Sequence, residues 1–369
     1  MSQQLVVHYS VHNQDAHEAA EALRVEQSIE FPRELAPEWI QNEVVGQVLS
    51  ITPQDESRSD ISIGYSLDSI AGEIPQLLNV LWGNASMLRG IKVRGVKYPE
   101  ELLATFRGPR FGIAGLREMF SAPQRPLAST ALKPMGMSSR ELADMAYTIA
   151  RAGFDTIKDD HSLANQPWSL WRDRVGMVAE AVARANKETG RTCVYAPSLN
   201  LPSDQILESA REAVKLGATS LLLLPGISGW DTVRAIAEDD SISVPIMAHP
   251  SFVGSLVNAE DHGLTHAIVF SDFARIAGAD ITIFPNFGGR FGFSQQECLS
   301  ITQAARGPLG SLKPMWISPA GGMTPEKIPS MIDIYGKDTA CLIGGALHRG
   351  DLFSNSSAMV EALEKLASA

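Results

Sequence analysis

The 369-residue sequence has few cysteines, no long apolar run and no excess of basic residues. Its cysteines, Cys193, Cys298 and Cys341, stand apart without CxxC spacing, which excludes a disulfide scaffold and favours reduced thiols. No apolar run approaches the roughly 18 residues of a transmembrane helix, and the first residues do not form a signal peptide. A net charge of −11 argues against nucleic-acid binding. We therefore expect a cytoplasmic protein that contacts neither membrane nor nucleic acid.

The first third of the sequence mixes short helix and strand signals in no regular order. Apolar spacing predicts helices over residues 16–23 and 74–82, and strands over residues 43–51 and 61–65. The proline-containing segment SAPQRP then interrupts the pattern. We expect a small α+β domain over residues 1–125.

From residue 126 onward, short apolar runs alternate regularly with segments that can form helices. The runs are short enough for strands buried on both faces, and they cover residues 127–132, 154–157, 192–196, 220–224, 244–248, 280–284, 313–317 and 340–343. Ser138 and Glu141 form a capping box at the first helix, and the third helix is predicted from Ser203 to Gly217. Eight even strand–helix units favour a (β/α)8 barrel over a doubly wound open sheet.

Polar residues follow the ends of several predicted strands, where such a barrel places its chemistry. The second strand ends in Lys158-Asp159-Asp160-His161, whose carboxylates and imidazole could bind a divalent cation. A charged turn that caps the next helix would give the same pattern. Lys133 follows the first strand, as a general base, an oxyanion contact or a surface lysine. His249 follows the fifth strand, either as a substrate-contacting residue or as a buried core histidine.

Two glycine pairs, Gly321-Gly322 and Gly344-Gly345, follow the seventh and eighth strands. Glycine lets backbone N–H groups come close to an anion, and a helix N-terminus adds a favourable field. Barrels often hold phosphate in these two loops, although each pair alone could be a tight turn. Together the pairs predict a phosphate site.

The order of these motifs resembles the large subunit of RuBisCO, and more closely the RuBisCO-like proteins that do not fix CO2. The resemblance is carried by Trp82-Gly83-Asn84, Ala131-Leu132-Lys133-Pro134, residues 154–160 with Asn165-Gln166-Pro167, and the glycine pairs. It implies a small N-terminal α+β domain of the ferredoxin-like kind over residues 1–125. The C-terminal (β/α)8 TIM barrel over residues 126–369 would be the catalytic domain.

The resemblance also implies a metal site. In that family the lysine of the strand-2 motif is carbamylated by CO2 and binds Mg²⁺ with the acidic residues that follow it. Carried over, Lys158 would be the carbamate and Asp160 the second ligand. The third ligand would be His161, where carboxylating enzymes have glutamate.

Other family positions have changed in ways that argue against carboxylase activity. The lysine after Lys-Pro is Met135, and the arginine that grips the distal phosphate after the strand-5 histidine is Pro250. The mobile-loop lysine that contacts CO2 corresponds loosely to Arg290. Arginine does not replace the point charge of lysine in a tight site.

The features that remain imply enolisation or isomerisation of a mono-phosphorylated sugar-derived substrate. Its phosphate would be bound by Gly321, Gly322, Gly344 and Gly345. Relatives act on 5-methylthioribulose 1-phosphate or its diketo derivative in methionine salvage, and the first of these is our expected substrate. Metal polarisation of a carbonyl would stabilise the enediolate.

The same resemblance assigns the remaining roles and leaves two alternatives. Lys133 would move the proton and His249 would orient a hydroxyl, while Asn84 and Glu26 correspond to positions that reach the neighbouring subunit, implying a homodimer with shared active sites. One alternative is a decarboxylase of a phosphorylated branched-sugar acid of the 3-oxo-isoapionate 4-phosphate type, in which Arg290 would hold the carboxylate. The other is a non-catalytic metabolite-binding relative.

Overall fold

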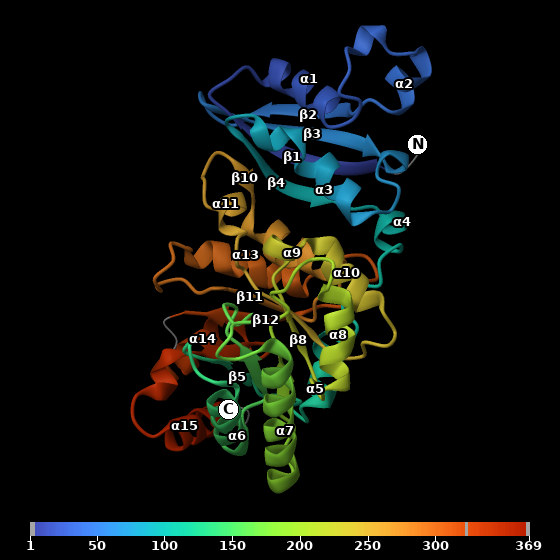
Figure 1. The fold of residues 1–369 in the computed structure, drawn as a ribbon. Coiled ribbons are helices and arrows are strands. Elements are labelled where there is room, and N and C mark those ends of the chain that lie inside the picture. Colours follow the sequence, from blue (N-terminus) through green and yellow to red (C-terminus); the bar gives the residue numbers. More distant parts are fainter. Residues whose placement is uncertain (1–3, 322–323, 367–369) are drawn as a thin grey trace.

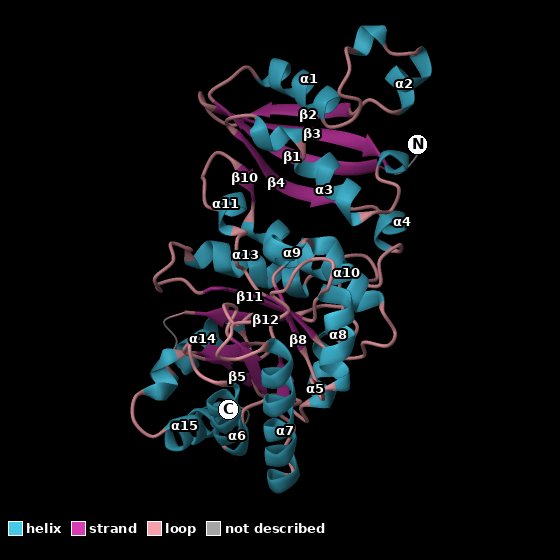
Figure 2. Cartoon of the chain, in the orientation of Figure 1, coloured by secondary structure: helices cyan, strands magenta, loops and turns pink. Residues whose placement is uncertain are grey.

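The computed structural model describes residues 4–321 and 324–366 and contains two sheets. The five-stranded sheet lies at one end of the molecule, and the eight-stranded sheet is surrounded by helices (Figure 1). Figure 2 shows the same division by secondary structure, with most of the helices around the second sheet. The predicted combination of an α+β unit and a barrel is therefore confirmed.

The N-terminal sheet has the order β10-β4-β1-β3-β2. Its strands near the N-terminus are β1 (Gln4–His12), β2 (Gln47–Pro53), β3 (Arg58–Ser66) and β4 (Ile91–Lys97), which pair antiparallel. Helices α1 (Ala16–Glu26) and α3 (Ile74–Trp82) belong to the same hydrophobic core as this sheet, to which they contribute buried leucines such as Leu23 and Leu81. The helix predicted over residues 74–82 is confirmed to the residue, while the strand predicted over 43–51 begins only at Gln47.

The barrel strands follow one another around the second sheet in chain order. They are β5 (Leu127–Leu132), β6 (Thr156–Asp159), β7 (Val194–Ala196), β8 (Leu221–Leu223), β9 (Ile246–Ala248), β11 (Ile281–Pro285), β12 (Trp316–Ala320) and β13 (Ala340–Ile343). All neighbours pair in parallel, and a parallel bridge between Ser198 and Leu222 joins β7 to β8. The eight strands thus form a closed barrel.

The principal helices around the barrel are amphipathic and bury one face each. They are α6 (Ser139–Arg151), α7 (Trp171–Thr189), α8 (Ile206–Lys215), α10 (Trp230–Glu238), α13 (Gln295–Arg306), α14 (Ile328–Tyr335) and α15 (Leu352–Lys365). The capping box at Ser138 and Glu141 is present. The prediction that the third helix starts at Ser203 is wrong, because the backbone N–H of Gln205 closes a turn on Pro202 and the helix begins at Ile206.

Shorter helices fill the connections. They are α2 (Glu38–Glu43), α4 (Glu100–Leu103), α5 (Gly112–Met119), α9 (Pro225–Ser228), α11 (Gly254–Val257) and α12 (Phe273–Ile276). Among the described residues, no helix combines the length and apolar character needed to cross a membrane.

The interior of the barrel is packed, and α5 contributes to that packing. Leu116 and Phe120, on and just after α5, share a buried cluster with barrel residues such as Met247 and Trp316. The Asp280 carboxylate accepts hydrogen bonds from the backbone N–H groups of Phe111 (2.7 Å), Gly112 (2.9 Å) and Ile246 (3.2 Å). These contacts fix the start of α5 against the barrel strands. The division of the chain near residue 125 stays a prediction.

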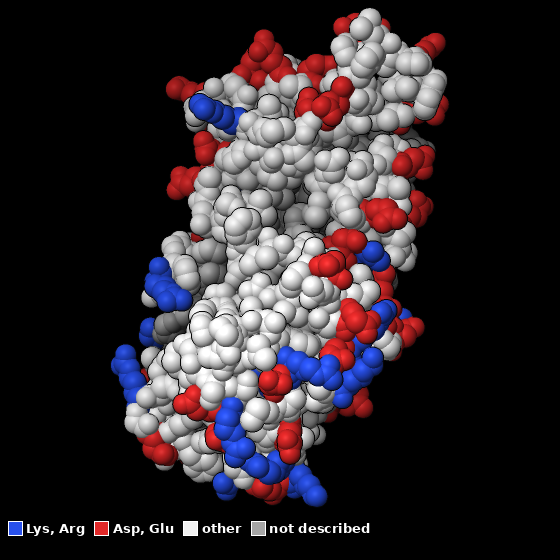
Figure 3. Space-filling model, viewed as in Figure 1, with Lys and Arg blue, Asp and Glu red and all other residues white. Residues whose placement is uncertain are grey.

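A segment between β9 and β11 connects the barrel to the N-terminal sheet. Its short strand β10 (Gly263–Leu264) pairs in parallel with β4, opposite Lys92 and Val93. Figure 1 shows β10 at the edge of the N-terminal sheet and α11 between it and the barrel. On the face in Figure 3, acidic side chains predominate over the N-terminal sheet, whereas basic and acidic side chains alternate over the lower barrel.

Candidate active site

One cavity of about 920 Å³ gathers most of the residues that the sequence singles out. It lies at the carboxyl ends of the barrel strands. The predicted residues that line it are Lys133, Lys158, Asp160, His161, His249, Arg290, Gly321, Gly344 and Gly345. Gly322 falls outside the described residues. Asn84 is not among the described residues that line the cavity.

Lys158 lies near the end of β6, where its side chain lines the cavity although the residue is almost fully buried. Its Nζ donates a hydrogen bond to the backbone oxygen of Asp159 at 3.0 Å. Burial lowers the pKa of Lys158 to about 8, against the opposing charge of Asp160. A larger fraction of this amine is therefore neutral at neutral pH than for a surface lysine.

Asp160 connects the lysines to the histidines of the cavity. Its Oδ2 lies 2.8 Å from Lys133 Nζ, and its Oδ1 accepts hydrogen bonds from the backbone N–H (3.2 Å) and the hydroxyl (2.8 Å) of Ser162. Burial alone would raise its pKa, but the hydrogen bond from Lys133 and the charges of Lys158 and Lys133 hold the pKa of Asp160 well below its usual range. The carboxylate is therefore ionised.

Two histidines from different loops stack beside this carboxylate. The rings of His161 and His249 lie 4.4 Å apart at 13°, and His161 Nδ1 is 3.2 Å from Asp160 Oδ1. Burial lowers the pKa of His161, and burial with the charge of Lys158 lowers the pKa of His249 well below its ordinary value. His249 Nδ1 accepts the backbone N–H of Ser251 at 3.2 Å, so the neutral ring carries its proton on Nε2.

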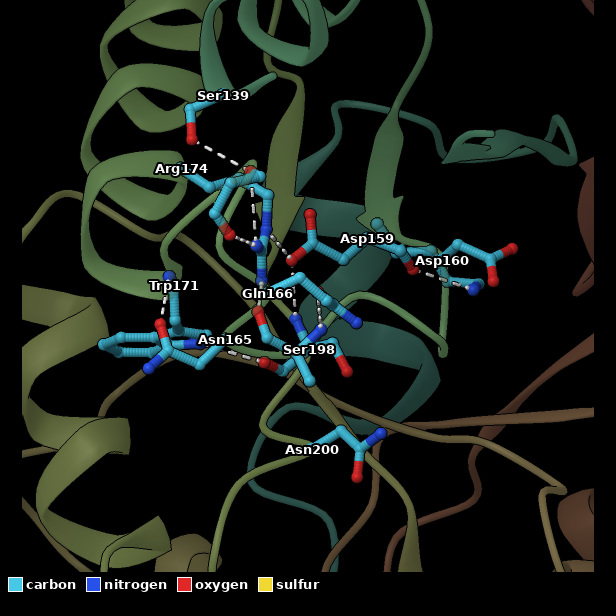
Figure 4. A network of polar contacts seen from close by, with 12 residues as sticks. Ser139, Asp159, Asp160, Asn165, Gln166, Trp171, Arg174, Ser198 and Asn200 are labelled. Atoms are coloured by element: carbon cyan, nitrogen blue, oxygen red, sulfur yellow. Dashed lines mark hydrogen bonds and ion pairs between the residues drawn. The ribbon is translucent and has the colours of Figure 1, made fainter. Parts of the chain in front are cut away.

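Asp159, which stands between Lys158 and Asp160, points away from the cavity, because successive side chains along a strand point to opposite faces. Asp159 accepts hydrogen bonds from Arg174 Nε at 3.0 Å, the Tyr195 hydroxyl at 2.8 Å and the backbone N–H of Ser198 at 3.1 Å. Arg174 and Asp159 side chains are both 0% exposed. Figure 4 shows Arg174, Asp159 and Ser198 of this network beside Asp160. Arg174 lies in α7, outside the motif, and only the structure identifies it as the partner.

The Asn165-Gln166-Pro167 segment shapes the loop after β6. Asn165 Oδ1 accepts the backbone N–H of Trp171 at 2.8 Å at the start of α7. Gln166 accepts the N–H of Ala164 at 2.9 Å and donates to the backbone oxygen of Ser162 at 2.7 Å. These bonds explain why the segment accompanies the motif without lining the cavity.

The loops after β12 and β13 leave open space beside their described glycines. A Cβ added at Gly321, whose φ is +92°, or at Gly345 would meet no heavy atom within 4 Å. A Cβ at Gly344 would lie 3.8 Å from Lys133 Nζ. Arg349 and Thr324 also line the cavity, although neither is among the site residues predicted from the sequence. Arg349 stands four residues after Gly345 in the same loop, a spacing that could have suggested it.

Two expected site residues of the N-terminal sheet region contact each other. Asn84 Nδ2 donates to Glu26 Oε1 at 2.7 Å. Residues 26 and 84 come from separate elements, the end of α1 and the turn after α3. The two residues therefore form a polar pair, and neither is among the described residues that line the cavity.

The donor set for a metal contains two ready-made ligands, Asp160 and His161. Among the described residues, no group of three or more His, Cys, Asp or Glu side chains is placed to hold a metal ion. Lys158 lines the same cavity, and its conversion to a carbamate would supply the missing anionic ligand. The residues present fit a divalent cation only when Lys158 is carbamylated.

Comparison with known proteins gives consistent results. Residues 112–292 match the model of the ribulose bisphosphate carboxylase large chain, catalytic domain. The chain is 36% identical over 350 residues to ribulose bisphosphate carboxylase-like protein 1 of Rhodopseudomonas palustris, covering 94% of this chain and 93% of that protein. It is 37% identical over 354 residues to 5-methylthioribulose-1-phosphate isomerase of Rhodospirillum rubrum, covering 95% and 92%.

A solved structure gives the same result in three dimensions. The crystal structure of a Rubisco-like protein from Rhodopseudomonas palustris superposes with a TM-score of 0.90 at 33% identity, covering 99% of both chains. The similarity of fold therefore extends over both sheets.

Proposed function

Because the chain belongs to the family of ribulose bisphosphate carboxylase-like proteins, we propose that it is an enzyme that enolises and isomerises 5-methylthioribulose 1-phosphate. Residues 126–369 would form the catalytic domain and residues 1–125 the smaller one. The extensive similarity to the Rhodospirillum rubrum isomerase supports this substrate. The reaction would serve methionine salvage and would not fix CO2.

The observation that carries the proposal is the composition of the cavity at the ends of the barrel strands. Lys133, Asp160 and the two stacked histidines occupy one part of it, and the described glycines occupy the loops after β12 and β13. A sugar phosphate needs both parts, since its carbonyl must meet proton-transfer groups while its phosphate is held elsewhere.

The proposed metal is Mg²⁺, held by carbamylated Lys158, Asp160 and His161. When bound, Mg²⁺ would polarise the carbonyl of the substrate and stabilise negative charge that develops on it. The buried, partly neutral amine of Lys158 supports carbamylation, because CO2 reacts with the uncharged amine.

The proton would be moved by Lys133. Its Nζ contacts Asp160 Oδ2 and lies beside Gly344, which places the amine between the metal ligands and the phosphate loop. His249 would donate from Nε2 to a substrate hydroxyl, because its Nδ1 is already bound to the backbone N–H of Ser251. Gly321, Gly322, Gly344 and Gly345 would bind the phosphate, and Arg349 would add positive charge.

The homodimer with shared active sites remains part of the proposal. Asn84 and Glu26 support it, because they form one polar pair in the N-terminal sheet region and do not reach the cavity of their own chain in the described structure. A neighbouring copy would receive them.

Product analysis tests the proposed reaction. The protein is incubated with Mg²⁺, bicarbonate and 5-methylthioribulose 1-phosphate, and substrate and product are followed by ¹H and ³¹P NMR. Formation of an isomer that a chelator suppresses is expected. Unchanged substrate in the presence of folded, Mg²⁺-saturated protein would remove this substrate from the proposal.

The decarboxylase alternative is supported by one further feature. Arg290 and Arg349 both line the cavity, which provides more guanidinium groups than one phosphate requires. Arg290 would hold the carboxylate of a branched-sugar acid phosphate. Release of CO2 from 3-oxo-isoapionate 4-phosphate, without isomerisation of the methylthio sugar, would favour this function.

A further inference from the structure

The cavity has an aromatic wall that none of the proposed catalytic roles uses. Five phenylalanines line it, namely Phe252, Phe270, Phe284, Phe291 and Phe293. Phe270 and Phe293 are buried and pack edge to face with centroids 5.6 Å apart. Phe252 differs from this buried pair, since it is 78% exposed while it lines the cavity.

Phe252 also has an unusual backbone conformation. Its φ of +73° lies in the left-handed region, which bulky side chains rarely adopt. Such strained residues concentrate at ligand-binding and active sites. We therefore expect the exposed ring of Phe252 to contact a ligand.

The turn that imposes this conformation is the one that fixes His249. The backbone N–H of Ser251 donates to His249 Nδ1, and the N–H of Val253 donates to the oxygen of Pro250 at 3.3 Å. The same short turn thus places His249 and Phe252 on one cavity. A substrate that contacts His249 would therefore lie close to Phe252.

The part of this wall that follows β9 is uncharged. The segment after β9 contributes Pro250, Ser251, Phe252, Gly254 and Asn258 to the cavity, and residues 250–258 contain no acidic or basic side chain. The cations Lys133, Lys158, Arg290 and Arg349 come from other loops. The Arg290 guanidinium lies 4.9 Å from the Phe291 ring centroid, so the segment after β9 is the part of the wall that is suited to an apolar group and offers no cation for a second phosphate.

We propose that Phe252, which lines the same cavity as the buried Phe270–Phe293 pair, binds the apolar end of the substrate and determines specificity for a thioether over a hydroxyl at that position. This inference rests on the proposed function, because it takes the phosphorylated sugar to be bound in this cavity. The ring would cover the methylthio group and remove it from water.

Non-reactive ligands test this subsite separately from catalysis. The alditols 5-methylthioribitol 1-phosphate and ribitol 1-phosphate lack the carbonyl, so they cannot be enolised. Their Kd values are measured by calorimetry for the wild type and for Phe252→Asn, because asparagine tolerates positive φ and preserves the turn. Phe353→Asn is the control, since Phe353 is 41% exposed on α15 and lies outside the set of described cavity residues.

The wild type and Phe353→Asn are expected to bind the methylthio alditol at least about tenfold more tightly than ribitol 1-phosphate. Phe252→Asn is expected to bring this ratio close to one while the Kd of ribitol 1-phosphate stays unchanged. An unchanged ratio, or equal weakening of both ligands, would overturn the subsite. Selective alditol binding without turnover of 5-methylthioribulose 1-phosphate would refute the proposed reaction alone, whereas no binding of either alditol would refute both.

Discussion

Replacement of Arg174 by methionine tests whether the buried network behind the catalytic motif holds the end of β6. Arg174 donates to Asp159 Oδ2 at 3.0 Å, to the backbone oxygen of Ser169 at 2.9 Å and to that of Ala164 at 2.8 Å. Arg174→Met keeps much of the side-chain volume and removes all of these bonds. It leaves the Asp159 carboxylate, which is 0% exposed, without its cation.

The expected loss of unfolding free energy is large because the Asp159 carboxylate stays buried without its charged partner. Removal of one such partner costs about 3–5 kcal/mol of unfolding free energy. The remaining donors to Asp159, the Tyr195 hydroxyl and the Ser198 N–H, do not carry a compensating charge. The exposed pair Arg191–Glu364, with side chains 46% and 43% exposed, provides the control, and Arg191→Met is expected to cost less than about 1 kcal/mol.

Urea unfolding of both variants measures the difference. Arg174→Met is expected to lower the transition midpoint without changing the m-value, and the double variant Asp159→Asn/Arg174→Met to recover part of the loss. A stability of Arg174→Met within about 1 kcal/mol of the wild type would refute the role given to this ion pair. The motif carries Lys158 and Asp160 on either side of Asp159, so turnover is expected to fall with stability.

Variants of Lys158, Arg349 and Asp280 test the proposed metal ligand, the phosphate site and a buried carboxyl group. Lys158→Met is expected to abolish bicarbonate-dependent Mg²⁺ binding in calorimetry, whereas the exposed Lys187→Met keeps it; retained binding would exclude Lys158 as a ligand. Arg349→Met is expected to raise KM about tenfold with little change in kcat, and Arg140→Met to leave both unchanged; equal values for the two variants would remove Arg349 from the phosphate site. Burial raises the pKa of Asp280 to about 6, so the folded state binds more protons than the unfolded state between about pH 4 and pH 6. Stability therefore falls as pH rises through this window, by up to about 1.4 kcal/mol per unit, and Asp280→Asn removes that slope; parallel urea-unfolding profiles would contradict it.

The barrel was predictable where its strands are short, apolar and buried on both faces. Residues 127–132 and 340–343 are strands to the residue, since their apolar side chains fit only a strand of that length between helices. The seventh strand was predicted three residues early. Lys313 donates from Nζ to the backbone oxygen of Arg110, and the strand itself begins at Trp316 and continues through Pro319.

Elements whose formation depends on residues far away in the chain could not be predicted from local sequence patterns. Strand β10 has two residues and exists because it pairs with β4, about 170 positions earlier in the chain. Arg174 could not be selected for the same reason, since it looks like one arginine among several on α7 until Asp159 is placed beside it. Phe252 was missed because its proposed role follows from a turn conformation, not from residue type.

Solvent deuterium exchange tests the proposed enolisation most directly. 5-Methylthioribulose 1-phosphate is incubated in D2O with Mg²⁺, bicarbonate and either the wild type or Lys133→Met, and the carbon-bound protons next to the carbonyl are followed by ¹H NMR. We expect loss of one of these proton signals with the wild type and at least a hundredfold slower loss with Lys133→Met, about the share that a positioned proton-transfer group contributes. Full retention of the signals with active-site-saturated wild type, or equal rates for the two proteins, would contradict it.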